Sequence, residues 1–148
     1  MHFGTDFNYF DVMAAAKKNY SKILDPICQE WFLTRNELDI LLFLYNNPMF
    51  DRAADIVSRR GIAKSHVSLG VASLEEKGLL QRVFDENDRR TAHLKLDSSG
   101  QTIAAQARQR QLRYFSALYQ GISQEEFETW QKITQKIYSN IENFENIP

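Results

Sequence analysis

The stretch IVSRRGIAKSHVSLGVASLEEKGLLQRVFDENDRRTAHLKL, Ile56 to Leu96, decides the fold of the surrounding chain. Its first residues, Ile56–Arg60, end a short predicted helix, and Gly61 supplies a tight turn. A second helix is predicted over Ala63–Gly78. Apolar residues at steps of four and three give that helix one inward face: Val67, Val71 and Leu74. Two strands around a polar turn are predicted over Leu79–Leu96: in the first, Leu80, Arg82 and Phe84 alternate with Leu79, Gln81 and Val83, and in the second, Thr91, His93 and Lys95 alternate with Ala92, Leu94 and Leu96.

Two helices joined by a glycine turn and followed by a β-ribbon are typical of a winged helix-turn-helix. Such a unit puts its second helix into the major groove of DNA and its ribbon, the wing, against a neighbouring groove. The outward side of the second helix presents, at its amino end, the side chains predicted to contact DNA: Lys64, Ser65, His66, Ser68 and Leu69. In the wing, Arg89 and Arg90 belong to the polar turn Asp85–Arg90 and can enter the minor groove, where the potential is most negative. Gly70 is predicted to let the second helix pack closely against the helix before it.

The distribution of charge supports this prediction, although the net charge of the 148 residues is only −1. Residues 58–95 contain 8 Lys or Arg and 5 Asp or Glu, a net charge of +3. Residues 1–57 carry a net charge of −3 and residues 96–148 a net charge of −1. The basic excess is therefore confined to the segment that would neutralise phosphates. The alternative for the wing turn is a solvated loop whose charges pair within the hairpin.

Upstream of this unit the sequence predicts two further helices. Asp6 is predicted to cap a long first helix with an apolar stripe at three- and four-residue steps. Pro26 lies inside that stripe and predicts a kink or break near Lys22–Asp25, because proline removes a backbone hydrogen bond. Thr34–Glu37 has the pattern of a capping box and opens the next helix. Asp51 is predicted to cap the short helix that follows.

Downstream, a helix capped by Asp97 or Ser98 is predicted to run to about Gln120. A second capping box, Ser123–Glu126, opens the last helix, whose apolar residues recur at steps of three and four. A core inside one subunit could absorb this stripe, but the small winged unit offers little room, so burial against a second chain is favoured. The residues predicted at this dimer interface are Phe10 and Met13 of the first helix and Trp130, Ile133, Ile137, Ile141 and Phe144 of the last.

Other classes of function find little support. No glycine-rich phosphate loop, GxSxG motif or His/Cys cluster stands at a catalytic spacing, so no enzymatic activity is predicted. His66 and His93 lack partners at metal-ligand spacing, so no metal or cofactor is predicted. Cys28 is predicted to be a small buried hydrophobe and not a redox sensor. A lone cysteine, without a signal peptide or an apolar run of membrane-spanning length, predicts a cytoplasmic protein.

The order of these parts resembles the MarR (multiple antibiotic resistance regulator) family over nearly the whole chain. Four segments carry the resemblance: Leu33-Thr34 before the second helix, LEEKGLL at Leu74–Leu80, DENDRR at Asp85–Arg90, and LDSSG at Leu96–Gly100. The wing segment, followed by Leu-x-Leu and a downstream glycine, is the most specific of them. The resemblance favours Arg90 as the minor-groove residue, with Asp88 orienting an arginine through a charge-assisted hydrogen bond.

The resemblance implies a mainly α-helical fold with a small β-wing, in a single domain of residues 1–148. Residues 34–97 would form the winged helix-turn-helix, and residues 1–32 and 98–148 would form the dimerisation helices of a triangular homodimer. The dimer would bind double-stranded DNA at a pseudo-palindromic operator as a sequence-specific repressor. Many relatives also bind a small effector, often an aromatic or phenolic acid, between the dimer helices and the winged unit. That effector lowers DNA affinity and releases the repressed gene.

The chain departs from the family pattern at several positions. Relatives often carry an arginine where Leu69 follows Val67-Ser68, and Pro26 interrupts the first helix. Oxidation-sensing members carry their cysteine near the start of the first helix, whereas Cys28 is near its end, so no redox role is carried over. Leu69 on the recognition face also leaves an alternative function open. In that alternative the protein is a winged-helix interaction module, an anti-repressor or co-regulator, that does not read DNA.

Overall fold

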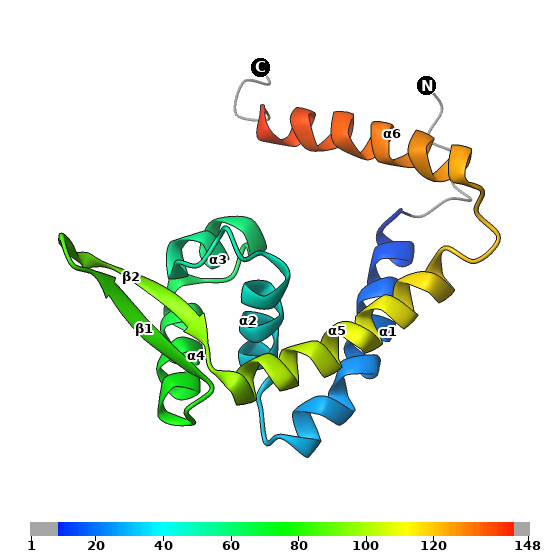
Figure 1. The fold of residues 1–148 in the computed structure, drawn as a ribbon. Coiled ribbons are helices and arrows are strands. Elements are labelled where there is room, and N and C mark those ends of the chain that lie inside the picture. The colour runs from blue at the N-terminus through cyan, green and yellow to red at the C-terminus, as the bar shows by residue number, and fades with distance from the viewer. Residues whose placement is uncertain (1–8, 144–148) are drawn as a thin grey trace. The chain divides into compact units, whose positions relative to one another are not determined.

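The computed structural model describes residues 9–143, and its elements confirm the predicted fold class, mainly α with a small β-wing (Figure 1). Within this range six helices and one two-stranded sheet follow in the order α1 (Tyr9–Glu30), α2 (Arg35–Asn46), α3 (Ala53–Arg60), α4 (Lys64–Glu76), β1 (Leu80–Asp85), β2 (Asp88–Leu96), α5 (Ser98–Leu118) and α6 (Gln124–Glu142). The chain divides into two compact units, of which the first ends at Tyr114 and the second begins at Phe115. None of the helices in the described range is long and apolar enough to cross a membrane.

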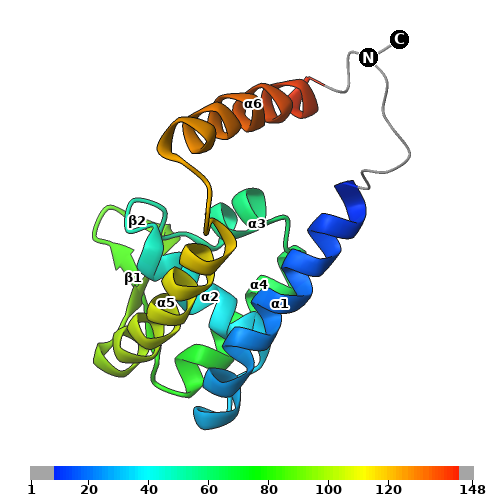
Figure 2. The same ribbon diagram turned by 90° about the vertical axis from the view of Figure 1, so that its right-hand side faces the viewer.

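Helix α2 is the centre of the first unit. Its capping box forms as predicted: the Thr34 hydroxyl accepts the Glu37 N–H at 3.2 Å, and the Glu37 carboxylate accepts the Thr34 N–H at 2.6 Å. Most of its residues are buried, and it lies between α4 and α5 in both views (Figures 1 and 2). The core around α2 includes, from the other elements of this unit, Leu24, Ile27, Ile56, Val67, Val71, Leu74, Leu80, Leu94, Ile103 and Ala107.

Helix α1 is continuous from Tyr9 to Glu30, so of the predicted kink or break near Lys22–Asp25 the break is wrong, and the kink stays a prediction. Pro26 still removes one backbone hydrogen bond from the helix. Leu24 and Ile27 lie on either side of it and are only 0% and 3% exposed, so their packing in the core holds the helix together there. Asp6, the predicted cap, lies outside the described residues.

The connection from α2 to α4 differs from the prediction at one cap. The amino-terminal cap of α3 is Arg52, whose N–H donates to the Asp55 carboxylate at 3.1 Å, so the prediction of Asp51 as the cap is wrong. At the other end of α3, Gly61 has a φ of 62° and makes the predicted tight turn into α4. This left-handed conformation is one that glycine adopts without steric cost.

The second unit contains α6. Its capping box is also formed, with the Ser123 hydroxyl accepting the Glu126 N–H at 3.3 Å and the Glu126 carboxylate accepting the Ser123 N–H at 2.8 Å. The rings of Tyr119, Phe127 and Trp130 cluster with centroids 5.0 to 5.6 Å apart. Further along, the apolar stripe stays about half exposed: Trp130 47%, Ile133 52%, Ile137 49% and Ile141 61%. Phe144, at the end of the predicted stripe, lies outside the described residues.

Candidate nucleic-acid interface

The amino-terminal half of α4 is seated against α2. The side-chain amide of Asn36 donates a hydrogen bond to the His66 carbonyl at 2.8 Å. One turn further along α4, a Cβ added to Gly70 would lie 2.5 Å from Cδ1 of Ile40 and 2.6 Å from Nδ2 of Asn36. Gly70 therefore allows the close approach of α2. The prediction that it accommodates the immediately preceding helix, α3, is wrong.

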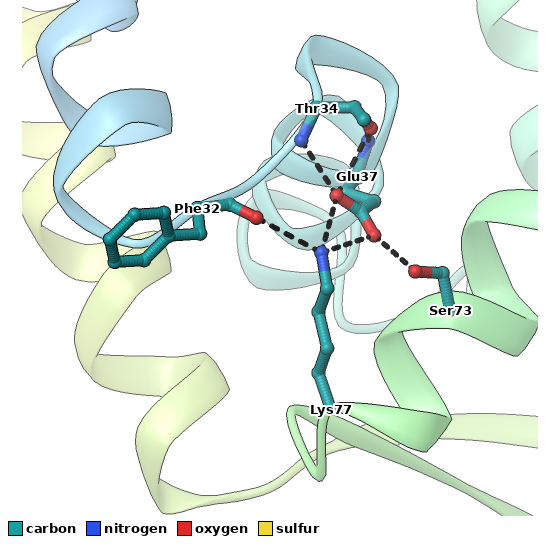
Figure 3. Close-up of polar contacts among 5 residues, drawn as sticks. All are labelled: Phe32, Thr34, Glu37, Ser73 and Lys77. Carbon is teal, nitrogen blue, oxygen red and sulfur yellow. Dashed lines mark hydrogen bonds and ion pairs between the residues drawn. The ribbon is translucent and has the colours of Figure 1, made fainter.

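The carboxyl-terminal end of α4 is fixed by a buried carboxylate, as Figure 3 shows. Glu37 is only 2% exposed, and its carboxylate accepts hydrogen bonds from Lys77 Nζ at 2.8 and 3.0 Å and from Ser73 Oγ at 2.5 Å. Lys77 Nζ also donates to the carbonyl oxygen of Phe32 at 3.1 Å. Burial alone would raise the pKa of Glu37, but the hydrogen bonds from Lys77, Ser73 and Thr34 outweigh it and hold that pKa below its ordinary value. The charged carboxylate thus ties α2 to the end of α4.

These contacts leave one side of α4 open. Val67, Val71 and Leu74 face the core and are at most 1% exposed, which confirms the predicted inward face. The other side carries the residues predicted to contact DNA, and all of them are exposed: Lys64, Ser65, His66, Ser68 and Leu69. The structure therefore brings these residues onto one accessible helix surface. Their contacts with DNA stay predictions.

The wing has a shorter turn than the sequence predicts. Its strands pair antiparallel from Leu80 opposite Leu96 to Phe84 opposite Ala92, and only residues 86–87 form the turn. Arg89 and Arg90 therefore lie in β2 and not in the turn. The pairing becomes irregular at this point, because the next paired residue on β2 is Asp88, opposite Asp85. The arginines lie on the bulged segment between the regular ladder and the turn, both of them exposed.

Asp88 organises this bulge through the backbone. Its carboxylate accepts the N–H of Arg90 at 2.9 Å and the hydroxyl of Thr91 at 2.8 Å. These two hydrogen bonds, that of Arg90 first, hold the pKa of Asp88 below its ordinary value. The charge-assisted hydrogen bond predicted between Asp88 and an arginine is made with the main-chain N–H of Arg90, and within residues 9–143 no ion pair joins Asp88 to a guanidinium. Asp88 orients Arg90 by fixing its main chain.

The base of the wing is held by a histidine that sequence reasoning missed as a structural residue. His93 of β2 places Nδ1 2.8 Å from the Asp51 carboxylate and Nε2 3.3 Å from the Asp85 carboxylate. The hydrogen bond with Asp51 is the largest cause of the raised pKa of His93. The Leu94 N–H also donates to the Asp51 carbonyl at 2.7 Å. Asp51 and His93 are 42 residues apart, so no local pattern could have paired them.

Basic side chains in the winged unit fall into two groups. Three are paired within the unit: Arg35 with Asp39 at 2.8 Å, Lys77 with Glu37 at 2.8 Å, and Arg82 with Glu75 at 3.2 Å. The second group makes no ion pair with any residue of the described range and is exposed: Arg52, Arg59, Arg60, Lys64, Arg89, Arg90 and Lys95. Arg59 and Arg60 were not among the predicted contact residues. Their guanidinium carbons lie 3.4 Å from the centre of the Phe50 ring and 5.2 Å from that of Phe43, so aromatic faces support both.

The other reactive groups considered from sequence form no cluster here. Among residues 9–143 no three His, Cys, Asp or Glu side chains come together at a distance suited to a metal ion. Cys28 is partly buried, and burial raises the pKa of its thiol, which favours the less reactive protonated form.

The segment that contains the candidate interface is similar to known proteins. Residues 33–91 match the family model described as the MarR family. The fold of a MarR family transcriptional regulator from Listeria monocytogenes, solved in complex with 26mer DNA, matches with a TM-score of 0.79 and 16% identity over 91% of this chain and 89% of that one. MepR from S. aureus, solved in complex with DNA, matches with a TM-score of 0.74 and 21% identity over 91% and 99%. NadR in complex with 4-hydroxyphenylacetate matches with a TM-score of 0.72 and 17% identity over 93% and 97%. The comparison with curated proteins gave no match.

The family match and the structural matches both include the elements of the candidate interface. The family match covers α2, α3, α4, β1 and the first part of β2, and so includes the exposed, unpaired basic side chains Arg59, Arg60, Lys64, Arg89 and Arg90. The structural matches extend the shared fold to about nine-tenths of the chain. Residues 33–91 of the chain are thus similar in sequence to the MarR family, and about nine-tenths of the chain shares the fold of solved MarR family regulators.

Proposed function

We propose that the protein is a sequence-specific, double-stranded DNA-binding transcription regulator. In this proposal α4 enters the major groove and the wing lies against the adjacent minor groove. The observation that carries the proposal is the group of unpaired basic side chains in the same unit as the open side of α4, because phosphate contacts supply much of the affinity for DNA. The two relatives solved with DNA support it. No enzymatic activity is part of the proposal.

The proposed contacts divide into two kinds. Lys64, Arg89 and Arg90, together with the newly identified Arg59 and Arg60, would supply attraction that depends little on sequence. The base-reading residues would be Ser65, His66, Ser68 and Leu69 at the amino end of α4. Asp88 would act as a positioning residue, since it holds the main chain of Arg90.

A homodimer is the second part of the proposal. The stripe on α6 is about half exposed within this chain, and Phe10 and Met13 of α1 are 79% and 50% exposed. An apolar stripe that is left this exposed is usually covered by a partner. A second copy, with two-fold symmetry, would cover the same surface on both chains. The proposed interface residues are Phe10, Met13, Trp130, Ile133, Ile137, Ile141 and Phe144.

A symmetric pair of winged units would meet two related half-sites, about 10 base pairs apart, in a pseudo-palindromic operator. We propose that occupancy of this operator represses a gene and that a small aromatic molecule releases the protein. NadR, solved with 4-hydroxyphenylacetate, is the relative that supports an effector of this chemistry.

DNA binding is tested by selection from a random duplex library with the purified full-length protein. The selected duplex and a scrambled duplex are then titrated at two salt concentrations. We expect two related half-sites to be enriched and affinity to fall steeply with salt, because bound counterions are released from phosphates. If no sequence is enriched and neither duplex binds, the proposal is wrong and a winged-helix protein–protein interaction module is favoured.

The dimer is tested by changing Ile137 and Ile141 to glutamate together and measuring mass by light scattering. The wild type should have the mass of a dimer, and the double variant should be a monomer or insoluble, since unpaired carboxylates buried in the interface cost several kcal/mol. Gln131→Glu with Gln135→Glu adds the same charges, at the same spacing, to exposed positions outside the stripe and should remain a dimer. A well-folded wild-type monomer at micromolar concentration would overturn the homodimer.

A further inference from the structure

We propose that Leu69 selects a thymine in each half-site through the C5-methyl group of that base. The inference rests on the proposed function and deepens it, because it names the base that the open side of α4 prefers. Among the four DNA bases only thymine presents a methyl group in the major groove, and apolar side chains contact that group directly.

Leu69 belongs to the outward side of α4. At about 100° per residue, one outward line of side chains falls within a sector of about 60°: Ser65, Leu69, Ala72 and Glu76. The opposite sector holds the buried positions Val67, Gly70, Val71 and Leu74. His66 and Ser68 fall on the two flanks of the outward line, about 60° or more from Leu69. A helix laid into a groove presents its outward side most deeply, and Leu69 lies within about 30° of the centre of that side, so it would meet the base edges.

The chemistry of this line is mixed. Leu69 is 69% exposed, and Ala72, one turn further on, is exposed as well, so two apolar side chains are neighbours on this side of the helix. A leucine side chain neither donates nor accepts a hydrogen bond. In a groove it gains only by removing apolar surface from water, and the thymine methyl is the apolar surface there. A single exposed leucine is ordinary on a protein surface, but this one stands where a bound duplex would dehydrate it.

The distribution of charge along α4 favours DNA, and not an apolar protein partner, as the molecule that binds the outward side of this helix. Lys64, at the amino end of α4, and Arg60, the last residue of α3, have no ion pair within the described part of the chain. Glu75 and Glu76 lie at the carboxyl end, where Glu75 is already paired with Arg82. Phosphates are therefore attracted to the amino-terminal half of the helix and repelled from the other half. This gradient places the base contacts near residues 65–69, and so places Leu69 among them.

The test uses the operator obtained by selection and the full-length protein. Each thymine is replaced in turn by deoxyuridine, which removes the C5-methyl group and leaves the hydrogen-bonding groups of the base unchanged. Affinity is measured by fluorescence anisotropy. We expect one position in each half-site at which the replacement weakens wild-type binding about fourfold, the equivalent of one buried methyl group. Leu69→Ala should show no such loss at that position, because the side chain that contacts the methyl group in the wild type is gone.

Met49→Ala is the matched control. It removes another large apolar side chain, 86% exposed and outside α4, and should keep the full sensitivity to deoxyuridine. Circular dichroism checks that Leu69→Ala is folded, as its exposure leads us to expect. If deoxyuridine changes nothing for the wild type, or if the loss persists in Leu69→Ala, the inference is wrong while DNA binding stands. If selection enriches no DNA, the inference and the proposed function are both wrong.

Discussion

The recognition helix and the wing are fastened to the same unit in different ways. Helix α4 is joined to α2 through Glu37, which is 2% exposed and accepts hydrogen bonds from Lys77 and Ser73. The wing is joined to the α2–α3 connection through His93 and Asp51, whose side chains are 21% and 36% exposed. A polar contact removed from water is strong and costly to break, whereas one in solvent is screened. Burial therefore fixes the position of α4, while solution conditions can weaken the attachment of the wing.

The largest expected effect comes from Glu37→Ala. The change leaves Lys77 and Ser73 without their buried acceptor and removes half of the α2 capping box, so the free energy of unfolding should fall by about 2–4 kcal/mol. Urea denaturation measures the difference. The control is Asp39→Ala, which breaks an ion pair of the same 2.8 Å length on the same helix, with side chains 31% and 37% exposed. Its cost should stay below about 1 kcal/mol. Equal losses would show that burial does not distinguish the two contacts.

His66→Ala tests whether α4 carries the sequence preference. We expect discrimination to flatten at one or two positions of each half-site, by about 1–3 kcal/mol for each well-formed hydrogen bond to a base that the change removes. The slope of log affinity against log salt should change little, because no phosphate contact is removed. Titration of the selected operator and its single-base variants measures both quantities. A uniform loss over all sequences, with a shallower slope, would instead make His66 a phosphate contact.

Arg90→Ala tests the contribution of the wing. Specific and non-specific binding should weaken together, and the salt slope should fall by up to about one unit per subunit. Arg82→Ala removes the same charge from the same ribbon, but Arg82 is already paired with Glu75 at 3.2 Å, so its effect should be smaller. If Arg90→Ala leaves the affinities and the salt slope unchanged, the wing does not touch DNA.

The smallest expected effect is the pH dependence of the wing attachment. The hydrogen bond with Asp51 raises the pKa of His93 in the folded protein, so protonation of His93 favours the folded state over the unfolded one. The stability gained is therefore fully present below the unfolded pKa of about 6.5 and is lost as pH rises through the higher folded value. The stability difference between wild type and His93→Gln, measured by thermal unfolding, should shrink from pH 5.5 to pH 8 (about one to two units either side of the unfolded value). Asp51→Asn should reduce the same dependence, while the Asp85 carboxylate, 3.3 Å from Nε2 of His93, retains part of it. A stability difference between wild type and His93→Gln that is constant with pH would contradict this prediction.

Patterns within a few residues predicted much of this molecule. The capping boxes beginning at Thr34 and Ser123 were predicted correctly. A hydroxyl and a carboxylate three residues apart can reciprocally accept the free backbone N–H groups only in the first turn of a helix. The inward face of α4 followed from helical spacing alone. The turn of the wing was predicted too long, because polar residues suit a turn and an exposed, bulged strand equally well.

The sequence by itself determined which segments form helices and strands and which side of the helices is apolar. Those features depend on neighbours within one or two turns. Only the tertiary structure decided which distant group each polar residue contacts. Glu37 and Lys77 are 40 residues apart, Asp51 and His93 are 42 apart, and Asn36 and the His66 carbonyl are 30 apart. Many other carboxylates, amides and cations in the chain have the chemistry to form such contacts. The packing of α4 and the wing around α2 brought these particular groups together.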